Sequence, residues 1–167
     1  NVHHTILALT DGLHYIINTK QEAVSIQEVE VKAPAYNGEA VCVAEHIMFF
    51  VSPNGVYEFT EQGVKLITGQ FFTEREWLEY AGEETRIAFW DDKIHGVGRH
   101  NWIMNFSDDD RRDPSFVVTT EKASNIYAHH QGGLVFVMKV GKDAKARLRK
   151  WGEPSEPNRC AVWRSPD

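Results

Sequence analysis

A strand–turn–strand pattern recurs along the sequence and limits the folds that are open to it. In one copy, the apolar run Ile47–Val51 leads through Ser52-Pro53-Asn54-Gly55 into Val56–Phe59. Proline fixes φ at the first corner of such a turn, and Asn-Gly can supply left-handed positions. The pattern predicts antiparallel hairpins. Three other segments place short apolar runs around turns of Gly, Asp or Asn: Thr5–Ile17, Arg86–Val97 and Asn125–Val140.

Other segments add strands to these hairpins. Val24–Val31 has the composition of a half-exposed strand, and Ala146–Trp151 alternates between charged and apolar residues. Arg86–Trp90 has two candidate partner strands. One is Ile94–Val97, directly after the turn, and the other is Asn101–Phe106. The sequence leaves these two pairings open.

One segment departs from the strand pattern. Thr73-Glu74-Arg75-Glu76 fits a capping box, in which the Thr oxygen accepts from a helix amide and the Glu reaches back. Phe72 before the cap and Trp77 after it fit the accompanying hydrophobic staple. Gly82 can end the helix in a left-handed conformation. We therefore predict one short helix over residues 74–81, which packs as a brace.

The repeated hairpins predict an all-β fold made of β-propeller-like antiparallel blades, or a sandwich of the same hairpins. A four-stranded blade takes about 40–45 residues, so this chain holds at most about four blades. With 167 residues and 42% hydrophobic content, we expect a single domain over residues 1–167. Because the sequence starts at Asn1 rather than Met, we expect processing or a piece of a longer chain. The longest apolar runs have strand length, so no membrane-spanning segment is predicted.

The histidines and acidic residues do not form a metal-binding pattern. His3-His4 and His129-His130 are adjacent pairs, and neighbours on a strand point to opposite faces. No HExxH or CxxC spacing occurs. Asp108-Asp109-Asp110 lacks the alternation of a calcium-binding loop, and the following Arg111-Arg112 competes for its carboxylates. We predict no metal ligand and no cofactor, and a solvated loop at the aspartates.

Residues that could serve catalysis or glycan binding are interpreted as packing groups. Cys42 and Cys160 each lie in an apolar, strand-like context where a buried thiol acts as a small hydrophobe; a bridge between them stays open. Carboxylate pairs for glycoside hydrolysis assemble in space, so a carbohydrate-binding or glycan-degrading propeller is the alternative function. No nucleophile elbow or phosphate-cradling glycine loop occurs, and no enzyme is predicted. Five tryptophans could stack on sugars but are more often core or interface residues: Trp77, Trp90, Trp102, Trp151 and Trp163.

The net charge of −6 is unevenly distributed. Residues 1–138 hold 10 Lys or Arg against 20 Asp or Glu, whereas residues 139–167 hold 8 against 4. A nucleic-acid-binding domain usually carries a basic footprint over its body, so specific DNA binding is not expected. The basic end is either a solvated hairpin face or a patch that meets the acidic body of a neighbouring copy in a head-to-tail ring.

Several segments also occur in a characteristic order: ILALTDGLHYII, AVCVAE, MFFVSPNGVYEF, GVKLITGQFFTEREW and LRKWGE followed by CAVWRSPD. This series resembles a group of phage tail structural proteins. In that family a Thr-Asp-Gly hairpin precedes a Ser-Pro-Asp-Gly-Leu hairpin, a Thr-x-x-x-Trp helix start and a closing Trp-Arg-Ser-Lys strand. The resemblance covers most of residues 5–165. Asn54 stands where the family has Asp, and Pro166 where it has Lys.

The resemblance implies a virion component with propeller-like architecture, similar to nozzle or tail-tip proteins built as rings around the DNA exit path. Thr10-Asp11-Gly12 and Ser52–Gly55 would be structural turns, Thr73 and Trp77 would brace the helix, and Trp163-Arg164-Ser165 would close a strand. The expected partners are other copies of the chain in a ring and neighbouring virion tail proteins, with DNA passing but not bound specifically. The expected location is the virion tail, assembled in the host cytoplasm. A cellular propeller scaffold is a third possibility.

Overall fold

The structure, a computed structural model, describes residues 5–9, 14–18, 25–29, 33–44, 46–60, 62–106, 114–119, 123–129, 133–140 and 145–150. These residues form fourteen β-strands, two short 3-10 helices and one short α-helix. The prediction of an all-β fold is therefore confirmed. The chain divides into two compact units, Asn1–Thr85 and Arg86–Asp167, which are described in turn.

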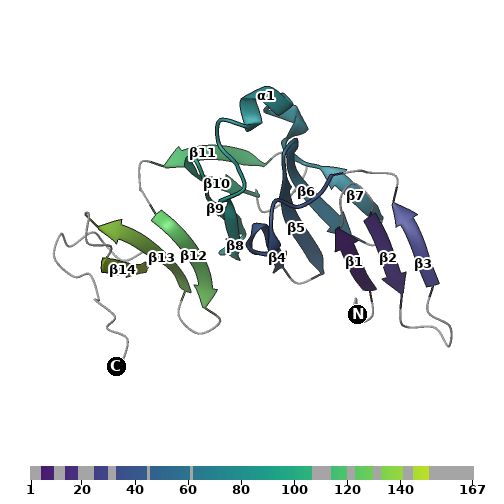
Figure 1. The fold of residues 1–167 in the computed structure, drawn as a ribbon, viewed down its shortest axis with the longest axis horizontal. Coiled ribbons are helices and arrows are strands. Elements are labelled where there is room, and N and C mark those ends of the chain that lie inside the picture. Colours follow the sequence, from purple (N-terminus) through teal and green to yellow (C-terminus); the bar gives the residue numbers. More distant parts are fainter. Residues whose placement is uncertain are drawn as a thin grey trace. The chain divides into compact units, whose positions relative to one another are not determined.

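The strands group into four antiparallel sheets, and within each sheet they follow the order of the sequence (Figure 1). Unit 1 holds the three-stranded sheet β1–β3 and the four-stranded sheet β4–β7. Unit 2 holds the four-stranded sheet β8–β11 and the three-stranded sheet β12–β14. The bounds are β1 Thr5–Leu9, β2 His14–Asn18, β3 Ser25–Val29, β4 Val41–Ala44, β5 Ile47–Ser52, β6 Gly55–Thr60, β7 Gly63–Leu66, β8 Arg86–Trp90, β9 Lys93–Val97, β10 Asn101–Asn105, β11 Ser115–Thr119, β12 Ala123–His129, β13 Gly133–Val140 and β14 Lys145–Lys150, with the helices η1 Gly38–Ala40, η2 Thr68–Gln70 and α1 Glu74–Trp77.

The first predicted hairpin consists of β1 and β2. Its register pairs Thr5 with Asn18 and Leu9 with His14. β3 lies within the predicted strand Val24–Val31 and pairs antiparallel with β2. The turn residues 10–13 lie outside the described residues. The backbone pairing therefore confirms this hairpin.

The turn between β5 and β6 has the Pro53-Asn54 corner that the sequence predicts. Ser52 is opposite Gly55 in the register, and the Ser52 hydroxyl donates to Asn54 Oδ1 at 2.8 Å. Gly55 has a φ of 148°, whereas Asn54 does not adopt a positive φ, so the glycine alone takes the left-handed role. A Cβ at position 55 would overlap the Thr68 side chain. Glycine at this position thus allows the backbone to approach Thr68 closely.

The sheet β4–β7 carries buried apolar side chains on both faces. Phe50 and Tyr57 are cross-strand neighbours on one face, and their rings stack with centroids 5.2 Å apart. Phe49 and Val51 alternate with Phe50 along β5 and are also buried, so they lie on the opposite face. The continuous apolar run Ile47–Val51 is thus the pattern of a strand covered on both sides.

The capping box and the hydrophobic staple predicted for the helix are both present. Thr73 Oγ1 accepts from the Glu76 amide at 3.4 Å, and Glu76 Oε2 accepts from the Thr73 amide at 2.8 Å. The ring centroids of Phe72 and Trp77 lie 6.0 Å apart. The buried indole of Trp77 donates from Nε1 to the carbonyl oxygen of Ser52 at 3.0 Å, which connects α1 to the end of β5.

The predicted helix over residues 74–81 is too long, because α1 spans only Glu74–Trp77. After Trp77 a hydrogen bond of the 3-10 type occurs, in which the Tyr80 amide donates to the carbonyl oxygen three residues earlier, that of Trp77, at 2.9 Å. The predicted left-handed cap at Gly82 is also wrong, because Gly82 has no positive φ. Its amide instead donates to Thr85 Oγ1 at 2.8 Å, and its carbonyl accepts from the Thr85 amide at 2.9 Å. This local turn competes with further helix and ends the segment.

Asn37 fixes the segment before β4 to the end of unit 1. Its Oδ1 caps η1 by accepting from the amides of Glu39 at 2.7 Å and Ala40 at 3.0 Å. Its Nδ2 donates to the carbonyl oxygens of Glu83 at 2.7 Å and Thr85 at 3.0 Å. A side-chain amide has two donor hydrogens and an oxygen with two lone pairs, so all its bonding positions are used.

In unit 2, β9 pairs with β8 on one side and with β10 on the other. The alternative partner considered for Arg86–Trp90, the segment that begins at Asn101, therefore pairs with β9 and not with β8. The β8–β9 turn consists of Asp91 and Asp92, with φ values of 51° and 54°. Two residues of positive φ are what a two-residue type I′ hairpin requires. Lys93 Nζ donates to the carbonyl oxygen and to a carboxylate oxygen of Asp91, each at 2.8 Å.

The two sheets of unit 2 pack through β8, β9 and β12. Ile126 of β12 is buried together with Ala88 of β8 and Val97 of β9. Trp90 and Ala123 are half-buried and pack against this cluster. β12 and β13 are the fourth predicted hairpin, and β14 adds the third strand of their sheet. One face of the sheet β8–β11 therefore lies against the next sheet along the chain.

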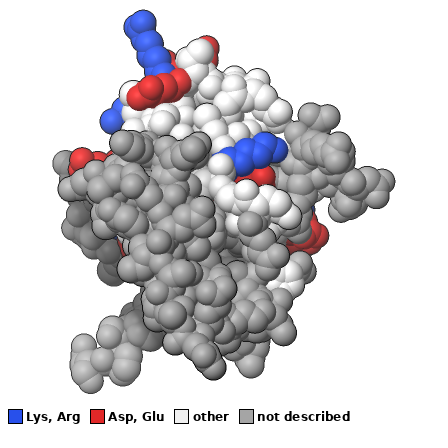
Figure 2. Space-filling model, turned by 90° about the vertical axis from the view of Figure 1, so that its right-hand side faces the viewer, with Lys and Arg blue, Asp and Glu red and all other residues white. Residues whose placement is uncertain are grey.

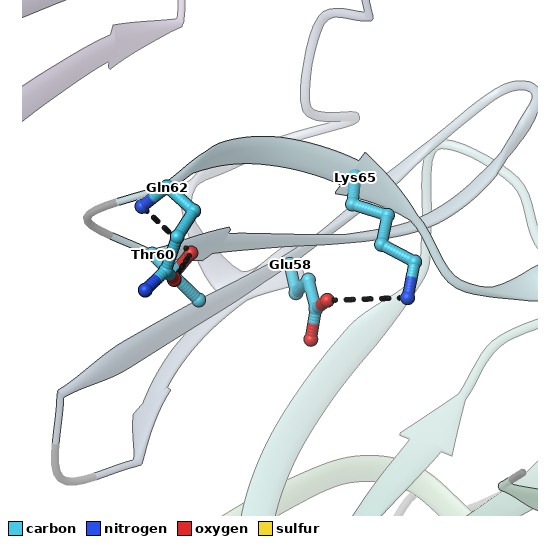
Figure 3. Close-up of polar contacts among 4 residues, drawn as sticks. All are labelled: Glu58, Thr60, Gln62 and Lys65. Atoms are coloured by element: carbon cyan, nitrogen blue, oxygen red, sulfur yellow. Dashed lines mark hydrogen bonds and ion pairs between the residues drawn. The ribbon is translucent and has the colours of Figure 1, made fainter. Parts of the chain in front are cut away.

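Charged side chains at the β6–β7 hairpin are paired across the strands (Figure 3). Glu58 and Lys65 are opposite in the register, with Lys65 Nζ 3.8 Å from Glu58 Oε1. At the turn, the Thr60 hydroxyl donates to Gln62 Oε1 at 2.8 Å. Lys65 is exposed whereas Glu58 is half-buried, and a pair that is open to solvent on one side contributes on the order of 1 kcal/mol or less. On the face drawn in Figure 2, described basic side chains likewise lie beside acidic ones.

Candidate interaction surface

The ionisable residues considered from the sequence do not converge in the part of the chain that the structure describes. Among those residues, no group of three or more His, Cys, Asp or Glu side chains is arranged to hold a metal ion. His3-His4, His130, Asp108–Asp110 and Cys160 lie outside the described residues.

The tryptophans considered as sugar platforms divide into core residues and residues not described. Trp77 and Trp102 are at most 1% exposed, which confirms the packing interpretation for both. Trp90 is half-buried against the core cluster of unit 2. Trp151 and Trp163 lie outside the described residues. Neither Trp77 nor Trp102 can present a ring face to a ligand at the surface.

Cys42 lies in β4 and has a free thiol. Burial raises the pKa of this thiol to about 12. The thiol is therefore protonated at neutral pH and is a poor nucleophile, since the thiolate is the reactive form. This agrees with the packing interpretation of Cys42.

His95 in β9 is a buried histidine with an exposed fraction of 1%. Burial lowers the pKa of its imidazole to about 4, and the charge of Lys93 adds to this shift. A backbone hydrogen bond at Trp90 and the charge of Asp91 act in the opposite direction. The imidazole is therefore neutral at pH 7.

The strand β11 forms an exposed apolar edge of the sheet β8–β11, and we call residues Ser115–Thr119 the β11 edge. Val117 is 54% exposed and Val118 is 45% exposed. In the sheet order, β11 is last, so within the described residues it has a neighbouring strand on one side. A strand in this position offers backbone N–H and C=O groups to an added strand. The β11 edge contains no charged residue.

The β11 edge is held on its own sheet by aromatic packing. The ring of Phe116 stacks on that of Trp102, with centroids 5.5 Å apart and an interplanar angle of 26°. Trp102 is opposite Gly96 in the register, and a Cβ added at Gly96 would overlap the indole ring. The contacts from Gly96 through Trp102 to Phe116 thus cross three strands. They position β11 while Val117 and Val118 stay exposed.

The sequence pattern described above does not predict β11. The signal present is the run Phe116-Val117-Val118-Thr119, whose aromatic and β-branched residues favour strands. The run is short and directly follows the polar segment 107–114, which is interpreted as a loop. Exposure at an edge also depends on which strands pair, and this is not a property of the run itself.

The sequence matches no known family model and no curated protein. In the described part of the chain, no helix is long and apolar enough to cross a membrane.

Proposed function

We propose that this chain is a structural component of a bacteriophage tail, of the nozzle or tail-tip type. It acts by packing against other copies of itself and against neighbouring virion proteins, and not by catalysis. The order of the motifs that resemble the tail family supports this proposal. Two of these motifs form ordered local structures, namely the turn at Ser52–Gly55 and the capped helix at Thr73–Trp77. The protein's place would be the virion tail, after assembly in the host cytoplasm.

We further propose that the four sheets are the blades of one propeller-like domain over residues 1–167. Sheets of consecutive antiparallel strands are the units from which propellers are built. The central strands β5 and β6 of the sheet β4–β7 carry buried side chains on both faces, as a blade between two others would. In unit 2, β8 and β9 of one sheet pack against β12 of the next, as adjacent blades do. These three features support the propeller.

The observation that carries a packing function is the β11 edge. Two exposed valines lie on a strand that aromatic contacts hold in place, and the strand has no charge. Monomeric proteins usually protect such edges with charged residues, proline or a covering segment. An apolar edge without a charge is suited to burial against another protein surface.

The charge distribution fits a ring around a DNA exit path. Residues 1–138 hold 20 acidic against 10 basic residues. If these residues line the channel, their field would repel the phosphates of DNA and prevent adhesion during passage. Copies in the ring and adjoining tail proteins would then be the partners, with no specific DNA contact.

Immunogold electron microscopy of virions from the source of the sequence tests this function. An antibody against the purified chain should label the tail tip or nozzle, and native mass spectrometry of the purified protein should give a ring stoichiometry. An antibody against a host protein is the control for labelling. The proposal is wrong if the antibody detects the chain in infected lysate but labels no virion, or labels only the capsid.

A further inference from the structure

We propose that Asn54 is a site of spontaneous deamidation, and that the fold protects Asn37 from the same reaction. Among the asparagines of the sequence, these two are the ones followed by glycine. An Asn-Gly pair is the reactive kind, because glycine has no side chain to hinder attack by its own backbone nitrogen. The inference does not depend on the proposed function, since it follows from the local structure around the two asparagines.

The reaction needs only the chain and water. The backbone nitrogen of Gly55 gives up its proton and bonds to Cγ of Asn54. The Cγ–Nδ2 bond then breaks, and the side-chain nitrogen leaves with that proton as ammonia, so a succinimide ring remains. Water adds to one of the two ring carbonyl carbons, whose bond to the Gly55 nitrogen breaks, and a hydrogen returns to that nitrogen. Addition at Cγ gives aspartate, whereas addition at the backbone carbonyl carbon gives isoaspartate.

The side-chain amide of Asn37 is fixed in place by four hydrogen bonds. Its Oδ1 accepts from the amides of Glu39 and Ala40, and its Nδ2 donates to the carbonyl oxygens of Glu83 at 2.7 Å and Thr85 at 3.0 Å. A nucleophile attacks an amide carbon from outside the amide plane, so this plane has to turn toward the glycine nitrogen. At Asn37 that rotation breaks bonds to a distant segment of the chain, and the same bonds hold the nitrogen that has to leave.

The side-chain amide of Asn54 is not held in this way. Within the described residues it makes one hydrogen bond, in which Oδ1 accepts from the Ser52 hydroxyl at 2.8 Å. This donor points at the oxygen on which negative charge develops as the glycine nitrogen adds, and such a donor favours the step. Asn37 and Asn54 are both half-buried, so exposure does not distinguish them. The difference therefore lies in the hydrogen bonds.

The two products should differ in their effect on the β5–β6 turn. Aspartate keeps the backbone and an oxygen that can accept from Ser52. Isoaspartate adds a carbon to the backbone between Ser52 and Gly55, which are opposite each other in the register. A Cβ added at Gly55 would already overlap Thr68, so the longer turn has no room on that side. Thermal unfolding of the two separated forms should give a lower midpoint for isoaspartate, and equal midpoints would contradict this account of the turn.

Peptide mapping of the purified full chain tests the site. The folded chain is incubated in mildly alkaline buffer, and samples are digested with a protease that cleaves after glutamate, which places the two asparagines in different peptides. Mass spectrometry measures the mass gained when the amide NH₂ becomes a hydroxyl group. The Asn54 peptide should gain this mass at least about tenfold faster than the Asn37 peptide, because the hydrogen bonds of Asn37 add to the barrier.

The same chain in urea is the matched control, because unfolding breaks the bonds of Asn37 and leaves both Asn-Gly pairs in place. The two rates should then become comparable. Asn54→Gln should remove the fast reaction of the folded chain, since the longer side chain closes a ring much more slowly. The inference is overturned if Asn37 reacts as fast as Asn54 in the folded chain, or if neither reacts there while both react in urea. It is also overturned if urea leaves the ratio of the two rates unchanged, because neighbours in the sequence then set the difference.

Discussion

At the scale of single residues, Asn37 joins backbone segments that lie 46 and 48 residues apart in the sequence. Asn37→Asp keeps the oxygen that caps η1 but removes both hydrogens donated to the Glu83 and Thr85 carbonyls, and it places a negative charge beside them. We expect the free energy of unfolding to fall by about 2–4 kcal/mol, the cost of two lost bonds and of the unmatched carbonyl groups. Urea denaturation measures this change.

Asn54→Asp is the control for this substitution, because both asparagines precede a glycine. Asn54 uses its Oδ1 to accept from the Ser52 hydroxyl, and an aspartate oxygen can do the same. We expect a change within about 0.5 kcal/mol, as for surface substitutions. Equal effects of the two substitutions would contradict the role assigned to the Asn37 amide hydrogens.

His95 makes the stability of the protein depend on pH. Its folded pKa of about 4 lies below the ordinary histidine pKa of 6.5, mainly because the side chain is buried. The unfolded chain therefore binds a proton first as the pH falls. The contribution of the neutral imidazole is complete above the unfolded pKa and is lost as the pH falls from about 6.5 toward 4.

We expect this group to lower the free energy of unfolding by about 2 kcal/mol between pH 7.5 and pH 5. Urea denaturation across this pH range measures the change. The His95→Gln variant is the control, because carboxylates that titrate in the same range change the free energy of unfolding equally in both proteins. The difference between the two pH profiles isolates the imidazole. Parallel profiles would show that His95 is not the titrating group.

At the scale of elements, the β8–β9 turn places two aspartates at positive φ, where glycine has no steric cost. Asp92→Gly should stabilise the hairpin by about 0.5 kcal/mol or more, because relief of the left-handed conformation outweighs the added freedom of the unfolded chain. Asp92→Ala should destabilise it for the same steric reason. Thermal unfolding of both variants measures the effects, and a common sign would contradict the type I′ assignment.

The close packing of the Trp102 indole against Gly96 predicts how a substitution at Gly96 changes stability. Gly96→Ala forces the indole to move, and overpacking of this kind costs about 1–3 kcal/mol. Because the Phe116 ring stacks on that of Trp102, a displaced indole should also shift the β11 edge. Association through that edge should then weaken. Chemical denaturation and sedimentation velocity measure the two effects.

Gly38→Ala is the matched control, since an added Cβ at Gly38 meets nothing within 4 Å. We expect a stability change within about 0.5 kcal/mol and unchanged association. If Gly96→Ala also leaves stability and association unchanged, the position of the Trp102 indole does not require a glycine at residue 96.

The helix shows which element-level features are readable from sequence. The start of α1 follows from adjacent residues, namely Phe72, Thr73, Glu76 and Trp77, and both predicted cap motifs are present. The glycine cap predicted for its end is absent because Thr85 binds Gly82 and holds it in a turn. A glycine near the end of a helix does not reveal whether a side chain three residues later will compete for it.

At the scale of the whole molecule, alternation and turn residues predict the all-β class and the principal hairpins. These signals act between residues that are close in the sequence. They suffice here because every paired strand in the four sheets is consecutive with its partner in the sequence. The β11 edge could not be predicted, because its exposure arises from being last in a sheet and not from its own residues. The Gly96–Trp102–Phe116 contacts likewise appear only once the register of three strands is known.

The acidic balance of the chain predicts its behaviour toward nucleic acid. With a net charge of −6, the purified protein should not retain duplex DNA near physiological ionic strength, because DNA binding relies on basic residues that neutralise phosphates. An electrophoretic mobility shift assay measures this. A salt-sensitive complex would contradict the expectation and show that the basic end, residues 139–167, acts as a DNA-binding footprint.

The agreement between sheet order and sequence order also bears on how the chain is made. Each sheet draws on one contiguous stretch of polypeptide, so its loop-closure entropy is small and its strands can pair soon after they leave the ribosome. Synthesis from the N-terminus would then complete the sheets one after another. The nascent protein would expose one unfinished sheet at a time, which limits aggregation on crowded polysomes.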